Sequence, residues 1–323
     1  MSLIVQKFGG SSLADAGKLL HIAHITKAVY DAGSDVIVVV SAQGDTTDQL
    51  IRKANEISSE PRARELDALL ASGEQISAAL TAMALESLGV PAVSLSAWQL
   101  PIRSDGVHGD ARIDRIEKER VTAELAKRRV VVVAGFQGVD GAGDATTLGR
   151  GGSDYSAVAL AAAFGAEKCL IYTDVDGVYT ADPRVCPTAR RLDRVSYEDM
   201  YALSRAGAQV LHDKCVALAQ EKGVEPEVRS CEADSVGTRV VPDGGCQGVT
   251  GVTRRENEGD AYAAVTLVGA ALPSLEIEKT AILALVAAGV AVYGVDAGER
   301  TLTLYVERGQ SRKAVRAAHD AVI

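Results

Sequence analysis

The sequence predicts an α/β protein, a three-layer αβα sandwich with a mainly parallel sheet, joined to a small α+β module. The first observation is an unbroken apolar run at Val36–Val40, with similar runs at Val130–Ala134 and Cys169–Tyr172. Continuous rather than alternating apolar strands indicate a parallel sheet that is covered on both faces. The second observation is that helical patterns separate these runs, which is βαβ construction. The third is a change of pattern near residue 240.

The N-terminal elements follow from local signals. Leu3-Ile4-Val5 predicts a strand, which Gly9-Gly10 ends, and Ser11 and Ser12 offer N-cap side chains for the next helix. Apolar residues keep a helical spacing over residues 18–29, and Gly33 ends that helix before the strand Val36–Val40. Farther along, Tyr155–Phe164 is rich in alanine and predicts a helix between two buried strands. Ligands of such a sheet bind at the carboxyl ends of its strands.

The C-terminal part has a different organisation. Residues 240–245 contain proline and paired glycines and predict a linker. A β-α-β-β-α order of ferredoxin type follows, which is typical of a binding face or an oligomer interface. Its predicted elements are Ala263–Val268, Leu275–Ala288, Ala291–Val295, Thr301–Val306 and a helix from Ser311 to the end. We therefore predict a domain at 1–240, a linker at 241–248 and a single module at 249–323.

Composition excludes several classes of protein. The 34 basic and 43 acidic residues give a net charge of −9, and aromatic residues are only 4%, so a nucleic-acid surface is not expected. No apolar run approaches the length of a membrane span, and the first residues do not have the pattern of a signal peptide, so we expect a cytoplasmic protein. The five cysteines are dispersed without a CxxC pair, which predicts reduced thiols and no structural zinc.

Glycine-rich or polar segments follow the predicted strands. Lys7 and two glycines precede a predicted helix, so backbone amides and one cation form an anion site, although neither a P-loop nor GxGxxG is present. Residues 147–154 place Arg150 among three glycines and Asp154 near a helix start, and a guanidinium fork suits a carboxylate. Ordinary βα turns or capped loops are the alternative interpretation of these segments.

Two further segments complete this pattern. Residues 172–184 follow a buried strand with a polar loop suited to a nucleotide, and residues 41–47 add hydroxyls to the same edge. No Ser-His-Asp set, Cys-His pair or GxSxG elbow is visible. Isolated Lys, Arg and Asp side chains on glycine-rich backbone favour phosphoryl transfer, which depends mainly on positioning and on charge stabilisation.

The motifs KFGGSS, SAQGDTT, ASGE, AGFQGVD, TTLGRGGSDYSA and YTDVDGVYTADPR occur in an order and spacing that resemble aspartate kinase, of the amino acid kinase superfamily. The resemblance covers roughly residues 1–240. It implies the amino acid kinase fold, a C-terminal ACT-type module and the phosphorylation of the side-chain carboxylate of L-aspartate by ATP and Mg²⁺. This reaction gives 4-phospho-aspartate for lysine, threonine and methionine synthesis. The acceptor is ionised at neutral pH, so no general base is needed.

The resemblance also implies roles for particular residues. Lys7 and Asp154 match catalytic positions, with Asp154 organising the phosphate-binding lysines, and the metal would be held mainly by the ATP phosphates. Arg150 matches the clamp for the substrate α-carboxylate and Glu74 the acceptor of the α-ammonium. The substrate-binding positions are completed by Ser41, Thr47, Gly151, Gly152 and Ser153. The nucleotide-binding positions are Lys7, Gly9, Gly10, Ser11, Thr173, Asp174, Tyr179, Asp182, Arg184 and Gln209.

The sequence departs from the family pattern at two places. Gln209 stands where the family has a second phosphate-binding lysine, and Arg205 or Lys214 could compensate for the missing charge. The tail resembles one ACT module where the family has two. A dimerisation remnant is therefore favoured over a lysine or threonine sensor, and a homodimer or higher homo-oligomer is expected. The alternatives are a sister kinase that acts on another carboxylate or a carbamate, and a catalytically weak regulator that binds amino acids.

Overall fold

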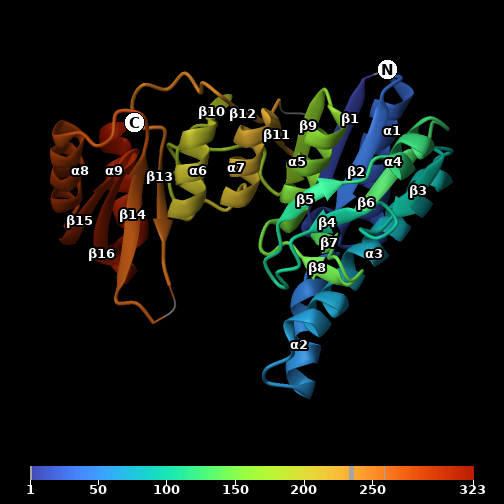
Figure 1. Ribbon diagram of the computed structural model, residues 1–323. Coiled ribbons are helices and arrows are strands. Elements are labelled where there is room, and N and C mark those ends of the chain that lie inside the picture. The colour runs from blue at the N-terminus through green and yellow to red at the C-terminus, as the bar shows by residue number, and fades with distance from the viewer. Residues whose placement is uncertain (1, 233–235, 258) are drawn as a thin grey trace. The chain divides into compact units, whose positions relative to one another are not determined.

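The computed structural model describes residues 2–232, 236–257 and 259–323, and the chain divides into two compact units (Figure 1). The first unit comprises Met1–Asp176 and Leu218–Ser235, and the second comprises Gly177–Ala217 and Val236–Ile323. The chain thus leaves the first unit after Asp176 and returns to it within the helix Asp213–Lys222. The domain boundary predicted at residue 240 remains a prediction.

A parallel sheet forms the centre of the first unit, in the order β11-β9-β1-β2-β6-β3. Its strands are β1 (Leu3–Phe8), β2 (Asp35–Val40), β3 (Ala92–Leu95), β6 (Val130–Ala134), β9 (Lys168–Thr173) and β11 (Pro226–Ser230). The predicted apolar runs lie inside β2, β6 and β9. Residues 36–40 and 130–134 are at most 1% exposed, because helices cover both faces of the sheet. The predicted parallel sheet is confirmed.

Helices α1 (Ala16–Asp31) and α3 (Ala63–Ser87) pack on one face of this sheet, and α5 (Gly152–Phe164) packs on the other. Leu19 and Ile22 of α1 and Leu85 of α3 share one apolar core with Val38 of β2. The smaller helices α2 (Thr46–Ile57) and α4 (Glu119–Leu125) contact α3 and β6, respectively. The predicted α/β class with three layers is therefore confirmed.

A second sheet in the same unit was not predicted. Its order is β5-β4-β7-β8, formed by β4 (Ile102–Ser104), β5 (Ile113–Ile116), β7 (Gln137–Val139) and β8 (Ala145–Thr147). These strands are three or four residues long and lack apolar runs, so no periodicity marks them in the sequence.

The first βα connection differs from its prediction in two respects. Strand β1 extends through Phe8, because Lys7 pairs with Val39 on one side and with Ile171 on the other. A 3-10 turn, η1 (Gly10–Leu13), follows, and α1 begins only at Ala16. The N-cap prediction at Ser11 and Ser12 is wrong: Asp15 caps α1 by accepting a hydrogen bond from the Lys18 amide at 2.9 Å.

Helix α3 is long and apolar enough to cross a membrane, judged by length and composition alone. More than half of its most apolar window is buried inside the protein, however, which is how the core helix of a folded domain behaves. Its buried residues Asp67 and Glu74 are both ionisable, and α1 and the sheet cover its apolar face. These features identify α3 as a core helix.

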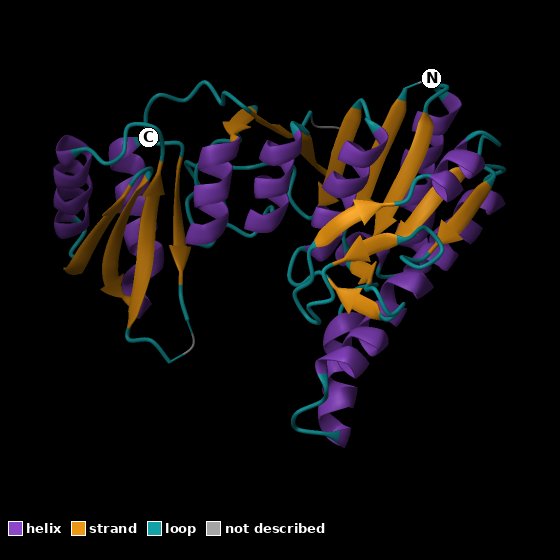
Figure 2. Ribbon diagram, in the orientation of Figure 1, coloured by secondary structure: helices purple, strands orange, loops and turns teal. Residues whose placement is uncertain are grey.

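The second unit contains the parallel pair β10 (Arg194–Ser196) and β12 (Thr238–Val241), with α6 (Tyr197–Ala206) and part of α7 (Asp213–Lys222). Val240 and Val241 are buried strand residues rather than the linker predicted for them. An antiparallel sheet follows in the order β13-β14-β16-β15, with α8 (Leu275–Ala287) and α9 (Ser311–Val322) on one face (Figure 2). Its strands are β13 (Gly251–Arg255), β14 (Tyr262–Val268), β15 (Val292–Gly298) and β16 (Thr301–Glu307). The ferredoxin-like module is confirmed, with β13 added in front of the predicted elements.

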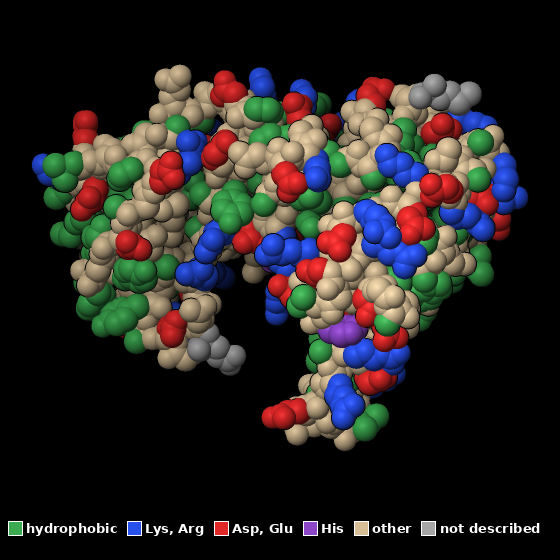
Figure 3. All heavy atoms as spheres, viewed as in Figure 1, with side chains coloured by type: hydrophobic (Ala, Val, Ile, Leu, Met, Phe, Trp, Pro, Cys, Tyr) green, Lys and Arg blue, Asp and Glu red, His purple; other side chains and the backbone are tan. Residues whose placement is uncertain are grey.

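Charged side chains of both signs are interspersed on the face seen in Figure 3 and do not gather into one basic patch. This agrees with the acidic balance of the sequence.

Candidate active site

The carboxyl ends of β1, β2, β6 and β9 meet at one edge of the parallel sheet (Figure 1). Backbone hydrogen bonds connect the loops there. The Gly9 amide donates to the Tyr172 carbonyl at 3.3 Å, the Gly44 amide to the Gly10 carbonyl at 2.9 Å, and the Gly135 amide to the Val40 carbonyl at 3.0 Å. Segments far apart in the sequence thus form one surface, at the edge where ligands of parallel sheets bind.

Lys7 and Asp154 form an ion pair at this edge, with Nζ and Oδ1 2.6 Å apart. The Lys7 side chain comes from β1 and Asp154 from the first turn of α5, and the two side chains are 11% and 12% exposed. Asp154 in the first turn of α5 thereby holds the Lys7 ammonium group beside the glycine backbone that follows β1. Because both charges are nearly buried, removing one would leave the other uncompensated. The pair therefore fixes one cation at a defined position.

The glycines after β1 have distinct roles. A Cβ on Gly10 would lie 2.5 Å from the Ala42 carbonyl oxygen, so only glycine allows the two loops to approach this closely. A Cβ on Gly9 would lie 3.6 Å from Lys7 Nζ, an ordinary contact distance, and Gly9 has extended backbone (φ −75°). The protein alone therefore does not require glycine at position 9. Glycine at this position leaves the space beside Lys7 Nζ free of a side chain.

Glu74 is a buried carboxylate whose two oxygens differ. Its Oε1 accepts a hydrogen bond from the Ala42 amide at 2.9 Å, and its Oε2 has no hydrogen-bond partner among the described residues. Glu74 is 3% exposed, and burial raises its pKa to about 7. Gly73 allows α3 to approach the Ala42 loop closely enough for this hydrogen bond, because a Cβ at position 73 would lie 2.9 Å from the Ala42 Cβ. A buried, half-satisfied carboxylate is well suited to receive a cationic group.

Ser41 and Thr47 lie on the loop after β2 and in the first turn of α2, and both are partly buried. The Ser41 amide donates to the Phe8 carbonyl at 3.2 Å, which places it beside the end of β1. Ser11 is exposed in the 3-10 turn, where its carbonyl accepts from Lys18 Nζ at 2.9 Å.

The loop before α5 carries Arg150 between two left-handed glycines, Gly149 (φ +75°) and Gly151 (φ +69°). Arg150 is exposed, whereas Gly152 and Ser153 are buried at the start of the helix. A Cβ on Gly135 would lie 3.0 Å from the Ser153 Cβ, so this glycine allows α5 to approach the sheet edge.

The predicted nucleotide loop divides between the two units. Thr173 and Asp174 belong to the first unit, where the Thr173 hydroxyl donates to the Asp174 carboxylate at 3.0 Å. Four further predicted residues belong to the second unit: Tyr179, Asp182, Arg184 and Gln209. Asp182 accepts a hydrogen bond from Arg184 Nε at 3.0 Å. Burial acts to raise the Asp182 pKa, but hydrogen bonds from the side chain and the backbone of Arg184 bring the pKa below its usual value. Gln209 is exposed between α6 and α7.

Sequence reasoning missed three groups at this site. They are the Ala42 amide, Gly135 and the buried Asp67 of α3. Gly135 lies inside the AGFQGVD motif, so a signal for it was present. Asp67 occupies a core-facing position of α3, and a carboxylate at such a position is the signal that could have identified it.

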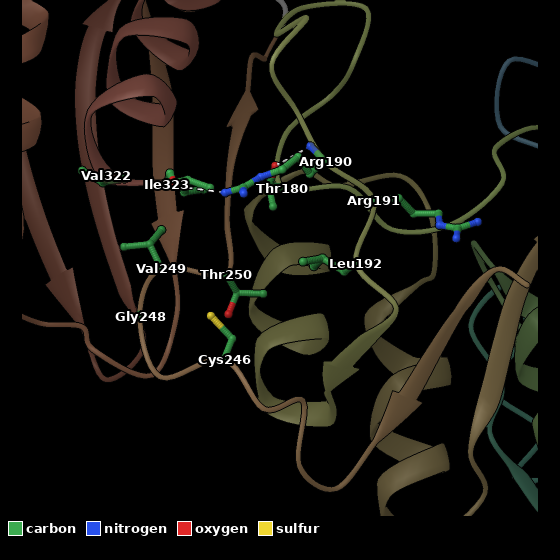
Figure 4. Close-up of a pocket in the computed structure, with 10 residues that line it drawn as sticks. All are labelled: Thr180, Arg190, Arg191, Leu192, Cys246, Gly248, Val249, Thr250, Val322 and Ile323. Atoms are coloured by element: carbon green, nitrogen blue, oxygen red, sulfur yellow. Dashed lines mark hydrogen bonds between the residues drawn. The ribbon is translucent and has the colours of Figure 1, made fainter.

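The second unit holds a cavity of about 430 Å³ that contains none of the predicted site residues (Figure 4). Arg190 crosses it: the amide donates to Thr180 Oγ1 at 3.0 Å and Nη2 donates to the Ile323 carbonyl at 3.0 Å. The cavity is lined by Thr180, Arg190, Arg191, Leu192, Cys246, Gly248, Val249, Thr250, Val322 and Ile323.

Beside this cavity, Cys186, His319 and Asp320 bring potential metal-ligand atoms within 4.8 Å of one another. The Thr188 hydroxyl already contacts all three groups: Cys186 Sγ at 3.1 Å, Asp320 Oδ1 at 2.6 Å and His319 Nδ1 at 3.4 Å. This cluster is a hydrogen-bond network centred on a hydroxyl that stands between the three groups. All five cysteines are free thiols.

Comparison with known proteins places this geometry in context. Residues 2–230 match the Amino acid kinase family. The aspartokinase of Geobacillus stearothermophilus is 50% identical over 240 residues, which cover 74% of this chain and 59% of that protein. The chain thus spans about three fifths of the length of this curated relative.

Two solved structures have the same fold over nearly the whole chain. Aspartate kinase from Synechocystis gives a TM-score of 0.68 at 29% identity and covers 99% of this chain and 69% of that chain. E. coli aspartokinase III in complex with lysine and aspartate gives a TM-score of 0.69 at 25% identity and covers 94% of this chain and 79% of that chain. The similarity to aspartate kinases that the motifs predicted is confirmed.

Proposed function

The chain belongs to the amino acid kinase family, and we propose that it transfers the γ-phosphoryl group of ATP to the side-chain carboxylate of L-aspartate. The product would be 4-phospho-L-aspartate, the first intermediate towards lysine, threonine and methionine. The similarity to aspartokinases at 50% identity supports this choice within the family.

The observation that carries the proposal is Glu74. Its Oε2 is buried and has no hydrogen-bond partner in the described part of the chain, and burial raises the pKa of this carboxyl group to about 7. An α-ammonium group at Oε2 would supply the missing hydrogen bond and the missing positive charge. Arg150, exposed between two glycines, is the matching group for the α-carboxylate. These two groups favour a zwitterionic amino acid over a carbamate or a simple acid.

The phosphate side of the site rests on Lys7 and its surroundings. Asp154 orients the Lys7 ammonium, and Gly9 leaves the space beside Nζ free of a side chain. Gly10 and Ser11 continue this backbone. Thr173 ends the adjacent strand β9, and Asp174 follows it. We propose that ATP places its phosphates against Lys7 and the glycine amides.

The reaction needs charge stabilisation rather than a base. The aspartate side-chain carboxylate is ionised at neutral pH and can attack without losing a proton. The obstacle is repulsion between this carboxylate and the ATP phosphates, which Lys7 offsets. Mg²⁺ would neutralise further phosphate charge. The Asp154 carboxylate is already paired with Lys7 at 2.6 Å. This agrees with a Mg²⁺ ion that is held mainly by the ATP phosphates rather than by protein carboxylates.

Further assignments follow from the same proposal. We place the enzyme in the cytoplasm as a homodimer or higher homo-oligomer. We propose that the ACT-type module at residues 249–323 does not act as an amino-acid sensor in this chain, so that millimolar lysine or threonine leaves the velocity unchanged. A velocity that falls with either amino acid would instead identify the module as a sensor.

The direct test is an ADP-release assay with L-aspartate, L-glutamate, succinate and carbamate as acceptors, combined with hydroxylamine trapping of the acyl phosphate. Only L-aspartate should give both ADP and a hydroxamate. ADP release with another acceptor would identify a sister kinase. If calorimetry detects binding of ATP and aspartate but no hydroxamate forms, the protein is a binding regulator, for which Gln209 in place of a lysine is the favouring observation.

A further inference from the structure

Asp67 of helix α3 is a buried carboxylate that the proposed chemistry does not use. It is 1% exposed, so its charge must be compensated by nearby donors. Its Oδ2 accepts hydrogen bonds from the amides of Gly109 at 2.9 Å and Thr147 at 3.0 Å, and from His108 Nδ1 at 3.0 Å. Its Oδ1 accepts from the Thr147 hydroxyl at 2.6 Å. One side chain therefore holds two backbone segments.

Both segments border the loop that carries Arg150. Thr147 is the last residue of β8, three positions before Arg150. The second segment lies against the loop, because a Cβ on Gly149 would clash with Asp110 Oδ1. The Ala111 amide also donates to the Thr147 carbonyl at 2.9 Å. Asp67 thus fixes both Thr147, where the Arg150 loop begins, and the Gly109 segment that lies against this loop.

This loop needs such an anchor, because left-handed glycines flank Arg150 and glycine restricts the backbone least. The start of α5, in contrast, has an anchor of its own. Ser156 Oγ donates to the Gly152 carbonyl at 2.9 Å and accepts from the Phe136 amide at 3.1 Å. Losing Asp67 should therefore release the Arg150 loop and leave Asp154 in place.

Asp67 and Glu74 lie on the same helix, seven residues apart. Seven residues are close to two helical turns, so both side chains leave one face of α3 about 10 Å apart along its axis. Glu74 is the proposed acceptor of the substrate ammonium, and Asp67 holds the loop proposed to bind the substrate carboxylate. One rigid helix thereby sets the spacing between the two recognition groups.

We propose that Asp67 is a positioning residue for the amino-acid substrate: through Thr147 and Gly109 it keeps the Arg150 loop at a fixed distance from Glu74. The inference rests on the proposed function, because it assumes that Arg150 and Glu74 bind the two ends of one amino acid.

The test uses Asp67→Asn in the full chain, because an amide nitrogen cannot accept the bonds that the carboxylate accepts. We expect KM and the calorimetric Kd for L-aspartate to rise roughly tenfold, which corresponds to losing one hydrogen bond to a charged group. KM for ATP should stay within about twofold and kcat should fall less than KM rises. Thr147→Val removes only the hydroxyl bond and should shift the same constant less. The double variant should be no worse than Asp67→Asn alone.

The matched control is Glu124→Gln. Glu124 is another buried carboxylate of the first unit, and the side chains that pair with it, Arg120 at 3.2 Å, Lys127 at 3.2 Å and Arg129 at 3.0 Å, are its near neighbours in the sequence. It should leave both substrate constants unchanged. An unchanged aspartate constant in Asp67→Asn, or an equal rise for ATP, would overturn the inference in favour of a general structural role.

If Asp67→Asn does not fold, the aspartate constants of Thr147→Val decide the question. If the parent chain phosphorylates another acceptor and neither binds nor phosphorylates aspartate, the proposed function fails and the inference fails with it. A parent active on aspartate with an unaffected Asp67→Asn refutes the inference alone.

Discussion

If Glu74 receives the substrate ammonium as proposed, its buried carboxylate should make aspartate recognition dependent on pH. Burial raises its pKa to about 7, and an ammonium ligand binds only the ionised form. With that pKa, about nine tenths of the free enzyme is ionised at pH 8 and about one tenth at pH 6. We therefore expect KM for L-aspartate to be about tenfold higher at pH 6 than at pH 8.

The perturbation that tests this is Glu74→Gln. The variant loses a charged partner for the substrate ammonium, worth about 1.5–3 kcal/mol, so KM for aspartate at pH 8 should rise about 10- to 100-fold. The KM of the variant should also lose its dependence on pH. Glu86→Gln on the exposed part of the same helix is the matched control and should behave as the parent does.

The same substitution should change stability in the opposite direction. A carboxyl whose pKa rises from 4.5 to about 7 on folding stabilises the protein fully only below pH 4.5, and this contribution is lost as the pH rises through 7. Relative to its full value below pH 4.5, the contribution of Glu74 to the free energy of unfolding is reduced by at most about 3 kcal/mol at pH 8 and by under about 1 kcal/mol at pH 5. Glu74→Gln should therefore have a higher Tm than the parent at pH 8 and nearly the same Tm at pH 5. A parent KM that is constant from pH 6 to pH 8, together with a variant no more stable at pH 8, would refute this reasoning.

Three further predictions concern the phosphate side. Lys7→Met should lower kcat about 10²- to 10³-fold in the ADP-release assay, because one fixed cation is lost, and a drop below about tenfold would contradict its catalytic role. Gly9→Ala should keep the parent Tm and raise KM for ATP, whereas Gly10→Ala should lower Tm, because its Cβ would lie 2.5 Å from the Ala42 carbonyl oxygen. If the two variants melt alike, the contrast is refuted. Gln209→Lys should give a higher kcat than the parent, since an amide cannot neutralise developing charge, and an equal or lower kcat would contradict the assignment of position 209.

Local sequence signals predicted most of the central elements. The apolar runs Val36–Val40 and Val130–Ala134 lie in β2 and β6, and both strands end where the runs end. Such short, β-branched-rich runs indicate strands of a parallel sheet that is covered on both faces. The first helix start was wrong, since both Asp15 and the two serines are good N-cap residues and their order alone does not choose between them. The tight turn at Gly10–Leu13 uses the residues on which the prediction relied.

The candidate site was only partly accessible to this reasoning. The sequence identified the candidate site residues Lys7, Glu74, Arg150 and Asp154, and the structure shows that Lys7 and Asp154 form an ion pair. The burial, hydrogen bonding and pKa of these side chains could not be predicted from the sequence. The raised pKa of Glu74 depends on its burial and on the single Ala42 amide, which lies 32 positions earlier in the chain.

The sequence by itself determined the fold class, the family resemblance and the residue types at the sheet edge, because these depend on periodicity and on short contiguous motifs. Only the tertiary structure decided which oxygen of Glu74 lacks a partner, why Gly10 tolerates no side chain, and what Asp67 holds. Those properties arise from contacts between residues 32 to 80 positions apart. Burial and hydrogen-bond satisfaction are set by such contacts, and no local pattern encodes them.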